Sequence, residues 1–165
     1  MNSDINEIIK PLFGKEQCEA RVGGSRSLSI GFGERIVSRV LPHNKKYHEW
    51  EIGTYYSSWR IVQNGRIICG SGESAESIGE LDVIVKDVKF GTISTITNLN
   101  HFDIRVEFDG GLSVDFFPAM SDEDEYFHIF CPHNMYVQFS SGGKWEMGKS
   151  DVPWMGKERP DTDAK

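Results

Sequence analysis

The cysteine and histidines near position 130 are the residues with which this chain could bind a metal. Cys131 is followed two residues later by His133, and His128 lies three residues before the cysteine. Zinc needs four nitrogen or sulfur ligands that converge on one point. In an alternating strand, however, Cys131 faces the core and His128 the opposite face, while His133 falls in a turn. These directions argue against a metal site, and we expect neither a metal nor a cofactor.

Nucleophilic catalysis has no motif to support it. No serine stands in the G-x-S-x-G pattern of a nucleophile elbow, and residues 70–72 lack the strand and helix that such an elbow needs. A cysteine that faces a core, as Cys131 is predicted to do, is a poor thiolate. The glycines at 23–24 and 31–33 lack the spacing of a phosphate-binding loop. We therefore expect no enzyme and name no catalytic residue.

The densest charge in the chain is an acidic run in a loop between two predicted strands. It consists of Asp122, Glu123, Asp124 and Glu125. One interpretation is a solvated loop that keeps a hairpin soluble. The other is a contact surface for a basic protein, because complementary charge would make association with such a protein faster and more specific. Both interpretations stay open, and the four residues are candidate partner contacts.

A second candidate surface lies in the first half of the chain. The stretch between Pro42 and Trp59 is about eight residues longer than its counterpart in the second half, and it contains Trp50, Tyr55 and Tyr56. Aromatic side chains with polar groups are common interface anchors. They are also ordinary strand residues, since Trp50 and Ile52 alternate as one buried face would. Trp50, Tyr55 and Tyr56 are thus further candidate contacts.

Composition limits the classes of partner. The 165 residues suit a single domain, and 18 Lys and Arg against 25 Asp and Glu give a net charge of −7. This balance argues against nucleic acid and against an anionic membrane surface. No long apolar run and no signal peptide is evident in the sequence. Three cysteines are too few for a disulfide scaffold, so we expect a cytoplasmic protein.

An internal repeat organises the chain. Residues 25–42 align without a gap on residues 101–118, at an offset of 76 positions, and residues 57–71 align on 126–141 at an offset of 68 to 69. Repeats of this kind indicate a duplicated unit. We expect one domain over residues 1–154, made of halves at about 4–71 and 80–148, with a polar connector between them and a charged tail at 155–165.

Turn motifs indicate how each half is built. Asp109-Gly110-Gly111 and Pro132-His133-Asn134 fit three-residue hairpin loops, and Asn64-Gly65 fits a two-residue type I′ turn. The Asn64-Gly65 turn is predicted to set Trp59 and Ile61 opposite Ile68. A capping pattern at Asp4 predicts a first helix, whereas residues 81–88 fit a helix or a strand. The expected class is α+β, predominantly antiparallel β, with a short helix and about five strands in each half around one shared core.

The chain also resembles a family of small uncharacterised bacterial proteins. The resemblance rests on KPLFGK, SLSIGFGE, HEWEIGTYYSSWRIVQNGRIICGS, DIRVEFDGGLSVDFF and AMSDEDEYFHIFCPHN. It implies a common fold without assigned catalytic residues, and the family is similar in character to immunity proteins that neutralise a bacterial toxin. We therefore expect a non-enzymatic protein-binding protein of the immunity type, with a basic toxin domain as its partner and a homodimer as an option. The alternative is a small-ligand-binding or structural domain with a pocket lined by the aromatic segment.

Overall fold

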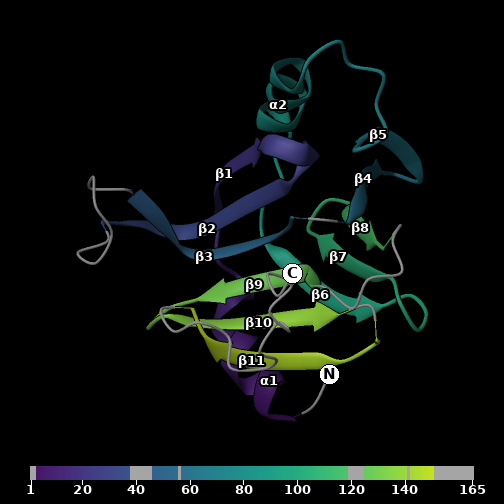
Figure 1. Ribbon diagram of the computed structural model, residues 1–165. Coiled ribbons are helices and arrows are strands. Elements are labelled where there is room, and N and C mark those ends of the chain that lie inside the picture. The colour runs from purple at the N-terminus through teal and green to yellow at the C-terminus, as the bar shows by residue number, and fades with distance from the viewer. Residues whose placement is uncertain (1–2, 38–45, 56, 119–124, 141, 151–165) are drawn as a thin grey trace, which may run out of the picture.

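The computed structural model describes residues 3–37, 46–55, 57–118, 125–140 and 142–150 (Figure 1). The elements are α1 (Ser3–Ile9), the 3-10 turn η1 (Lys10–Leu12), β1 (Gln17–Val22), the 3-10 turn η2 (Gly24–Arg26), β2 (Leu28–Val37), β3 (Lys46–Thr54), β4 (Ser58–Gln63), β5 (Arg66–Gly70), α2 (Ile78–Asp87), β6 (Ile93–Asn98), β7 (Ile104–Phe108), β8 (Leu112–Phe117), β9 (Glu125–Cys131), β10 (Met135–Ser140) and β11 (Trp145–Lys149).

Two antiparallel sheets make up most of the fold. Sheet 1 has six strands in the order β1-β2-β3-β9-β10-β11, and sheet 2 has five in the order β5-β4-β8-β7-β6. The buried hydrophobic side chains of both sheets form one continuous cluster. The expected class, α+β with mostly antiparallel strands and two short helices, is therefore confirmed.

Neither sheet is built from one half of the sequence alone. In sheet 1 the second-half strand β9 pairs with β3, and in sheet 2 the first-half strand β4 pairs with β8. Each half thus adds a hairpin to the sheet of the other (Figure 1). Exchanging β1–β5 with β6–β10 converts the strand order of one sheet into that of the other, apart from β11.

The first ladders of the two halves have the same register. Every pair in β6–β7 lies 76 positions after a pair in β1–β2, and the two ladders share a bulge of one residue at the same place. The pairs on either side of the bulge are Gln17 with Phe32 and Glu19 with Gly31 in the first ladder, and Ile93 with Phe108 and Thr95 with Glu107 in the second.

The predicted hairpin turns have the expected backbone. Phe108 pairs with Leu112, and both glycines of the intervening loop have positive φ, so the loop has the left-handed residue that ends a three-residue hairpin. Asn64 and Gly65 have φ of 50° and 76°, which are the signs of a type I′ turn. The β9–β10 turn likewise closes with Cys131 opposite Met135. These local predictions are confirmed.

The predicted pairing of Ile68 is wrong. A bulge between Ile61 and Val62 shifts the β4–β5 register, so that Ile61 pairs with Cys69. Cys69 is 1% exposed and belongs to the core, whereas Ile68 is 42% exposed. One inserted residue reverses the faces of a strand, because side chains alternate with period two.

The gapless alignment of 25–42 on 101–118 does not extend to the structure beyond Phe32. β2 passes through a bulge at Gly33, whose φ is 73°, and continues to Val37, whereas the chain turns between β7 and β8. By register β8 corresponds to β3, since each is the third strand of its meander. The extra length of the first half therefore begins in the extended ends of β2 and β3, before Trp50.

Residues 78–87 form a helix. The helix α2 begins after Ser77, whose Oγ accepts a hydrogen bond from Glu80 N at 3.2 Å. Leu81 and Val85 are buried, and Asp82 Oδ1 accepts from Val22 N at 2.8 Å. These contacts hold α2 beside β1 (Figure 1). They favour a helix here over a strand, which the β-branched residues of this segment also allowed.

Replacing Ser77 with alanine is expected to lower the free energy of unfolding by about 1 kcal/mol, because the N-cap acceptor is lost. Urea unfolding monitored by circular dichroism measures this change. Ser74→Ala, in the exposed segment before the helix, is the matched control and should stay within about 0.5 kcal/mol of the wild type. Equal losses for the two variants would contradict the capping role.

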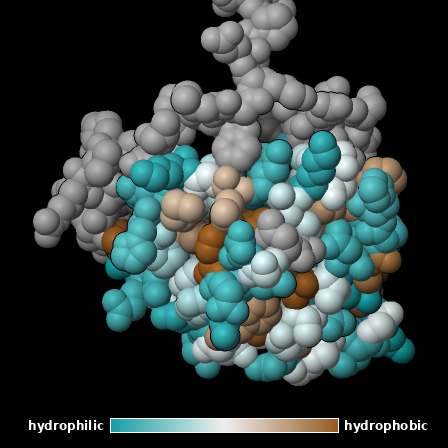
Figure 2. Space-filling model, turned by 90° about the horizontal axis from the view of Figure 1, so that it is seen from below, coloured by the Kyte–Doolittle hydropathy of each residue, from teal (hydrophilic) through white to brown (hydrophobic). Residues whose placement is uncertain are grey.

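The core contrasts with the surface of the molecule. Its largest fully buried side chains include Trp59, Phe32, Phe116 and Phe127. Figure 2 shows one face, on which hydrophobic residues form small separate groups among hydrophilic ones. Within the described ranges, no helix is long and apolar enough to cross a membrane.

Candidate functional site on the outer face of sheet 1

Each sheet has an outer face, turned away from the shared core, and that of sheet 2 carries a closed ion network. Asp115 is 1% exposed and lies between two arginines on neighbouring strands. Arg60 Nε donates to Asp115 Oδ2 at 2.8 Å, and Arg105 Nε donates to Oδ1 at 2.6 Å. Burial alone would raise the pKa of Asp115, but the hydrogen bonds from Arg105 and Arg60 outweigh it and lower the pKa. This row of three neighbouring register positions, 60, 115 and 105, therefore has a side chain at each position, and their charges are paired.

The equivalent row of sheet 1 has a glycine at its centre. Gly53 takes the register position of Asp115, flanked by Ser29 on β2 and His128 on β9. A Cβ at Gly53 would lie 2.2 Å from the carbonyl oxygen of Leu28 and 3.3 Å from His128 Nε2. Glycine is therefore required by the close approach of β2, and position 53 contributes no side chain between Ser29 and His128.

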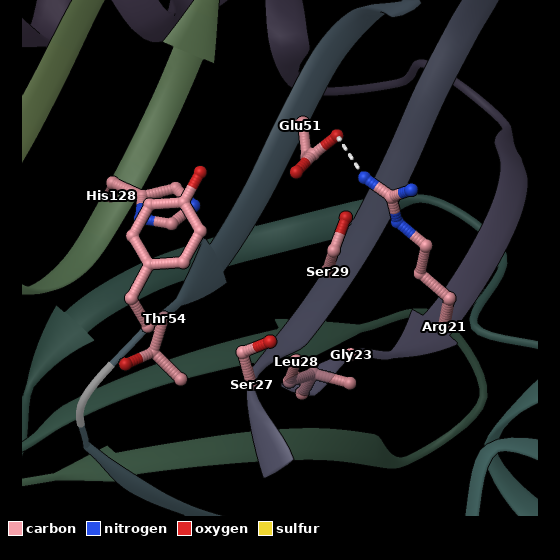
Figure 3. A pocket seen from close by; sticks show the side chains of 9 residues that line it. Arg21, Gly23, Ser27, Leu28, Ser29, Glu51, Thr54 and His128 are labelled. Atoms are coloured by element: carbon pink, nitrogen blue, oxygen red, sulfur yellow. Dashed lines mark ion pairs between the residues drawn. The ribbon is translucent and has the colours of Figure 1, made fainter. Parts of the chain in front are cut away.

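A pocket of about 140 Å³ opens at this place. Its lining comes from β1, β2, β3, β9 and the adjoining turns, and consists of Arg21, Gly23, Ser27, Leu28, Ser29, Glu51, Thr54, Tyr55 and His128. Figure 3 shows Arg21 and Glu51 on one side and His128 on the other. Arg21 Nη2 lies 3.8 Å from Glu51 Oε2, an ion pair at the edge of contact distance. The polar groups around the pocket do not form a complete ion network, in contrast to those on the outer face of sheet 2.

His128 is a buried polar side chain in the wall of the pocket. It is 1% exposed, and the rings of Tyr55 and Phe130 each pack against it with centroids 4.7 Å away. Its Nδ1 contacts Glu125 Oε1. An ionised carboxylate only accepts, so Nδ1 is the donor in this contact, which leaves Nε2 as the second polar atom of the ring. Nε2 is buried and has no hydrogen-bond partner among the described residues.

The structure brings together two of the predicted contact residues. Tyr55, from the aromatic segment, and Glu125, from the end of the acidic run, both contact His128. Tyr55 is 46% exposed, so its ring also reaches solvent. Asp122, Glu123, Asp124 and Tyr56 lie outside the described residues.

Trp50 lies elsewhere. It is 3% exposed and belongs to the core cluster with Ile52, its neighbour on the same face of β3. A side chain in this position stabilises the sheet from within and has almost no surface to offer a partner. Of the two interpretations of this residue, its position favours core packing.

The cysteine and histidines that suggested zinc diverge. Burial raises the pKa of the Cys131 thiol to about 12, so the group stays protonated. His133 has a φ of 62° in the β9–β10 turn. Within the described part of the chain, no group of three or more His, Cys, Asp or Glu side chains is placed to hold a metal ion.

The pocket could not be predicted directly from the sequence, because its lining residues come from four strands. No protein-family model, curated protein or solved structure matches this chain. A glycine between two β-branched or bulky strand positions was the available signal, since Gly53 interrupts the pattern of β3.

Proposed function

We propose that the protein is a non-catalytic binding protein of the immunity type, which contacts a basic protein partner through the outer face of sheet 1. The observation that carries the proposal is the buried, unpartnered Nε2 of His128 in a pocket that Glu51 also lines. A buried polar atom without a partner is costly, so a ligand that supplies the missing hydrogen bond gains affinity.

The size of the pocket supports a side chain as its occupant. Sites for cofactors and drug-sized ligands have roughly 300–1,000 Å³, whereas this one has about 140 Å³. A single side chain that projects from a partner needs far less room. Interface anchors commonly fill pockets of this kind, surrounded by a rim that excludes water. Tyr55 would form part of that rim.

The charges support a cationic occupant. Glu51 and Glu125 contribute two carboxylates to the surroundings of His128, and Arg21 contributes one guanidinium. In the tautomer that donates from Nδ1 to Glu125, His128 offers an acceptor at Nε2. A lysine or arginine side chain supplies donors to both Nε2 and Glu51, and charge-assisted hydrogen bonds are the strongest of their kind. The net charge of −7 favours approach of a basic partner.

The same chemistry accommodates a small free cation, which is the alternative function. N-acetyl-arginine amide and N-acetyl-lysine amide test the shared chemistry by NMR, with N-acetyl-glutamate amide as the acidic comparison. We expect saturable shifts of the Ser29, Glu51 and Gly53 amides with the two basic probes only. Glu51→Gln should weaken binding about tenfold, whereas Glu107→Gln, on the outer face of sheet 2, should leave it unchanged. Equal binding of the acidic probe would refute the proposal.

A capture experiment separates the two sources of the cation. Wild-type, Glu51→Gln and Glu107→Gln proteins are immobilised and exposed to lysate of the source organism. If a basic protein is retained by the wild type and by Glu107→Gln but lost by Glu51→Gln, the occupant is a partner side chain. If the probes bind and no protein shows this pattern, the small-ligand alternative holds.

We also infer that the two halves arose by duplication and that the protein resides in the cytoplasm. The matched registers and bulges of β1–β2 and β6–β7 support the duplication. The three cysteines are all unpaired thiols, which suits a reducing compartment.

A further inference from the structure

Cys18, His48 and Glu19 form a nucleophile, base and carboxylate arrangement at the edge of sheet 1. Cys18 Sγ lies 3.3 Å from His48 Nδ1, and His48 Nε2 lies 3.2 Å from Glu19 Oε2. Arg35 Nη2 donates to the same Glu19 oxygen at 3.0 Å. The His48 side chain is only 7% exposed, whereas Cys18 is exposed. Nucleophilic cysteines are activated by a base that a third group orients in this way.

Two irregularities of the sheet create this arrangement. The β1 bulge inserts Cys18 between Gln17, which pairs with Phe32, and Glu19, which pairs with Gly31. His48, on β3, reaches across β2 above Gly31. A Cβ on that glycine would lie 2.3 Å from Cγ and Cδ2 of the imidazole ring. The histidine can therefore reach β1 only because position 31 has no side chain.

The second half of the chain holds the same bulge without the site. Ser94 takes the register position of Cys18, and Glu107 takes that of Gly31. The Ser94 hydroxyl donates to the carbonyl oxygen of Glu107 at 3.1 Å, and the Glu107 carboxylate accepts from Thr95 Oγ1 at 2.8 Å. Position 94 therefore provides an exposed site of matched backbone geometry.

We propose that Cys18 is a site of thiol–disulfide exchange with small-molecule disulfides, with His48 as the proton acceptor. The Cys18 S–H proton passes to His48 Nδ1 while Sγ attacks one sulfur of the incoming disulfide. The S–S bond of that molecule breaks, its second sulfur leaves as a thiolate, and that thiolate takes a proton. Cys18 is oxidised to a mixed disulfide, and one equivalent of small thiol is released.

The surroundings favour this chemistry over acyl transfer. Exchange keeps the developing charge on sulfur, so it requires no oxyanion hole. Desolvation raises the pKa of the Cys18 thiol, although Arg35 acts in the opposite direction. The resting group is therefore a protonated thiol that depends on His48 to react. Cys69 and Cys131 are buried in the core, so neither resolves the mixed disulfide.

The test uses 4,4′-dithiodipyridine with the folded protein, following release of 4-thiopyridone. We expect one thiol per chain to react promptly, the other two only in denaturant, and mass spectrometry to place the adduct on Cys18. His48→Asn should slow the reaction at neutral pH at least tenfold, as general-base contributions of about 10²-fold or more imply. Gly31→Ala should slow it as well, because it displaces the ring while leaving both reacting residues present.

The matched control is Ser94→Cys in a Cys18→Ser background, which presents an exposed thiol without a histidine. Wild-type Cys18 should react faster than this thiol. Circular dichroism and thermal melting check that each variant is folded. If His48→Asn does not fold, the comparison of wild-type Cys18 with Ser94→Cys still tests the proposal. Equal rates for Cys18 and the thiol at position 94 would overturn the proposal, as would an unchanged rate in both folded His48 and Gly31 variants.

Discussion

Replacing Asp115 with asparagine is expected to lower the free energy of unfolding by roughly 2–3 kcal/mol. Breaking a buried ion pair typically costs about 3–5 kcal/mol, because a charge is left without its partner. Here Arg60 and Arg105 are partly exposed and can turn toward water, which reduces the cost. Urea unfolding at neutral pH measures the change. Glu107→Gln, on the outer face of the same sheet, is the control and should change stability by less than about 0.5 kcal/mol.

The destabilisation caused by Asp115→Asn is expected to depend on pH, and the lowered pKa of Asp115 determines the sign. The pKa of Asp115 is lowered below its ordinary value of 3.8 in the folded protein. A carboxyl with a lowered folded pKa contributes stability that is present above the unfolded pKa and is lost as pH falls through the folded pKa. The stability difference between wild type and Asp115→Asn should therefore be largest at neutral pH and shrink below about pH 4. A difference that stays constant into acid would contradict the role of the two arginines.

Alanine at Phe32 or at Phe108 should lower the free energy of unfolding by about 3–5 kcal/mol each, the range for deleting a buried aromatic ring. Both side chains are buried, and their rings stack with centroids 6.2 Å apart and planes 13° from parallel. One ring belongs to sheet 1 and the other to sheet 2. Urea denaturation with two probes, tryptophan fluorescence and far-ultraviolet circular dichroism, measures both the loss and the number of transitions.

The stacked pair also predicts coupling between the sheets. The double variant should be less destabilised than the sum of the single variants, because each single change already removes the shared contact. Unfolding should remain one cooperative transition for both probes, since the sheets share one core. Phe102→Ala, an exposed ring, is the control and should have a small effect. Strict additivity together with two separate transitions would show that the sheets are independent.

Local features of the fold could be predicted from the sequence because neighbouring residues determine them. The turn at Asn64-Gly65 depends on two residues that tolerate positive φ, and the strands that flank Gly110 can be predicted from their alternating apolar and polar residues. The irregular register of β4 and β5 beside Ile61 could not be predicted in this way, because an extra residue in one strand depends on how that strand pairs with its partner. That single miss exchanged the faces of Ile68 and Cys69.

The candidate site could be predicted only in fragments. Tyr55 and Glu125 were named from aromatic character and charge, but their common contact, His128, was assigned only to an outer face. Its burial depends on strand β9 pairing with β3, a choice between distant segments that periodicity does not encode. The contact of Cys18 with His48 has the same origin, because it requires β2 between them to carry a glycine.

The exchange of hairpins between the halves has a consequence for the order of synthesis and folding. Ser58 pairs with Phe117, and Glu51 pairs with Phe130, so both junctions join segments far apart in the chain. A nascent chain that has emerged only as far as β5 has unpaired edges at β3 and β4, and neither sheet can be completed. Pairings of such long sequence separation fold slowly. We therefore expect the first half to remain incompletely folded on the ribosome, exposed to chaperones and proteases, until the second half has been translated.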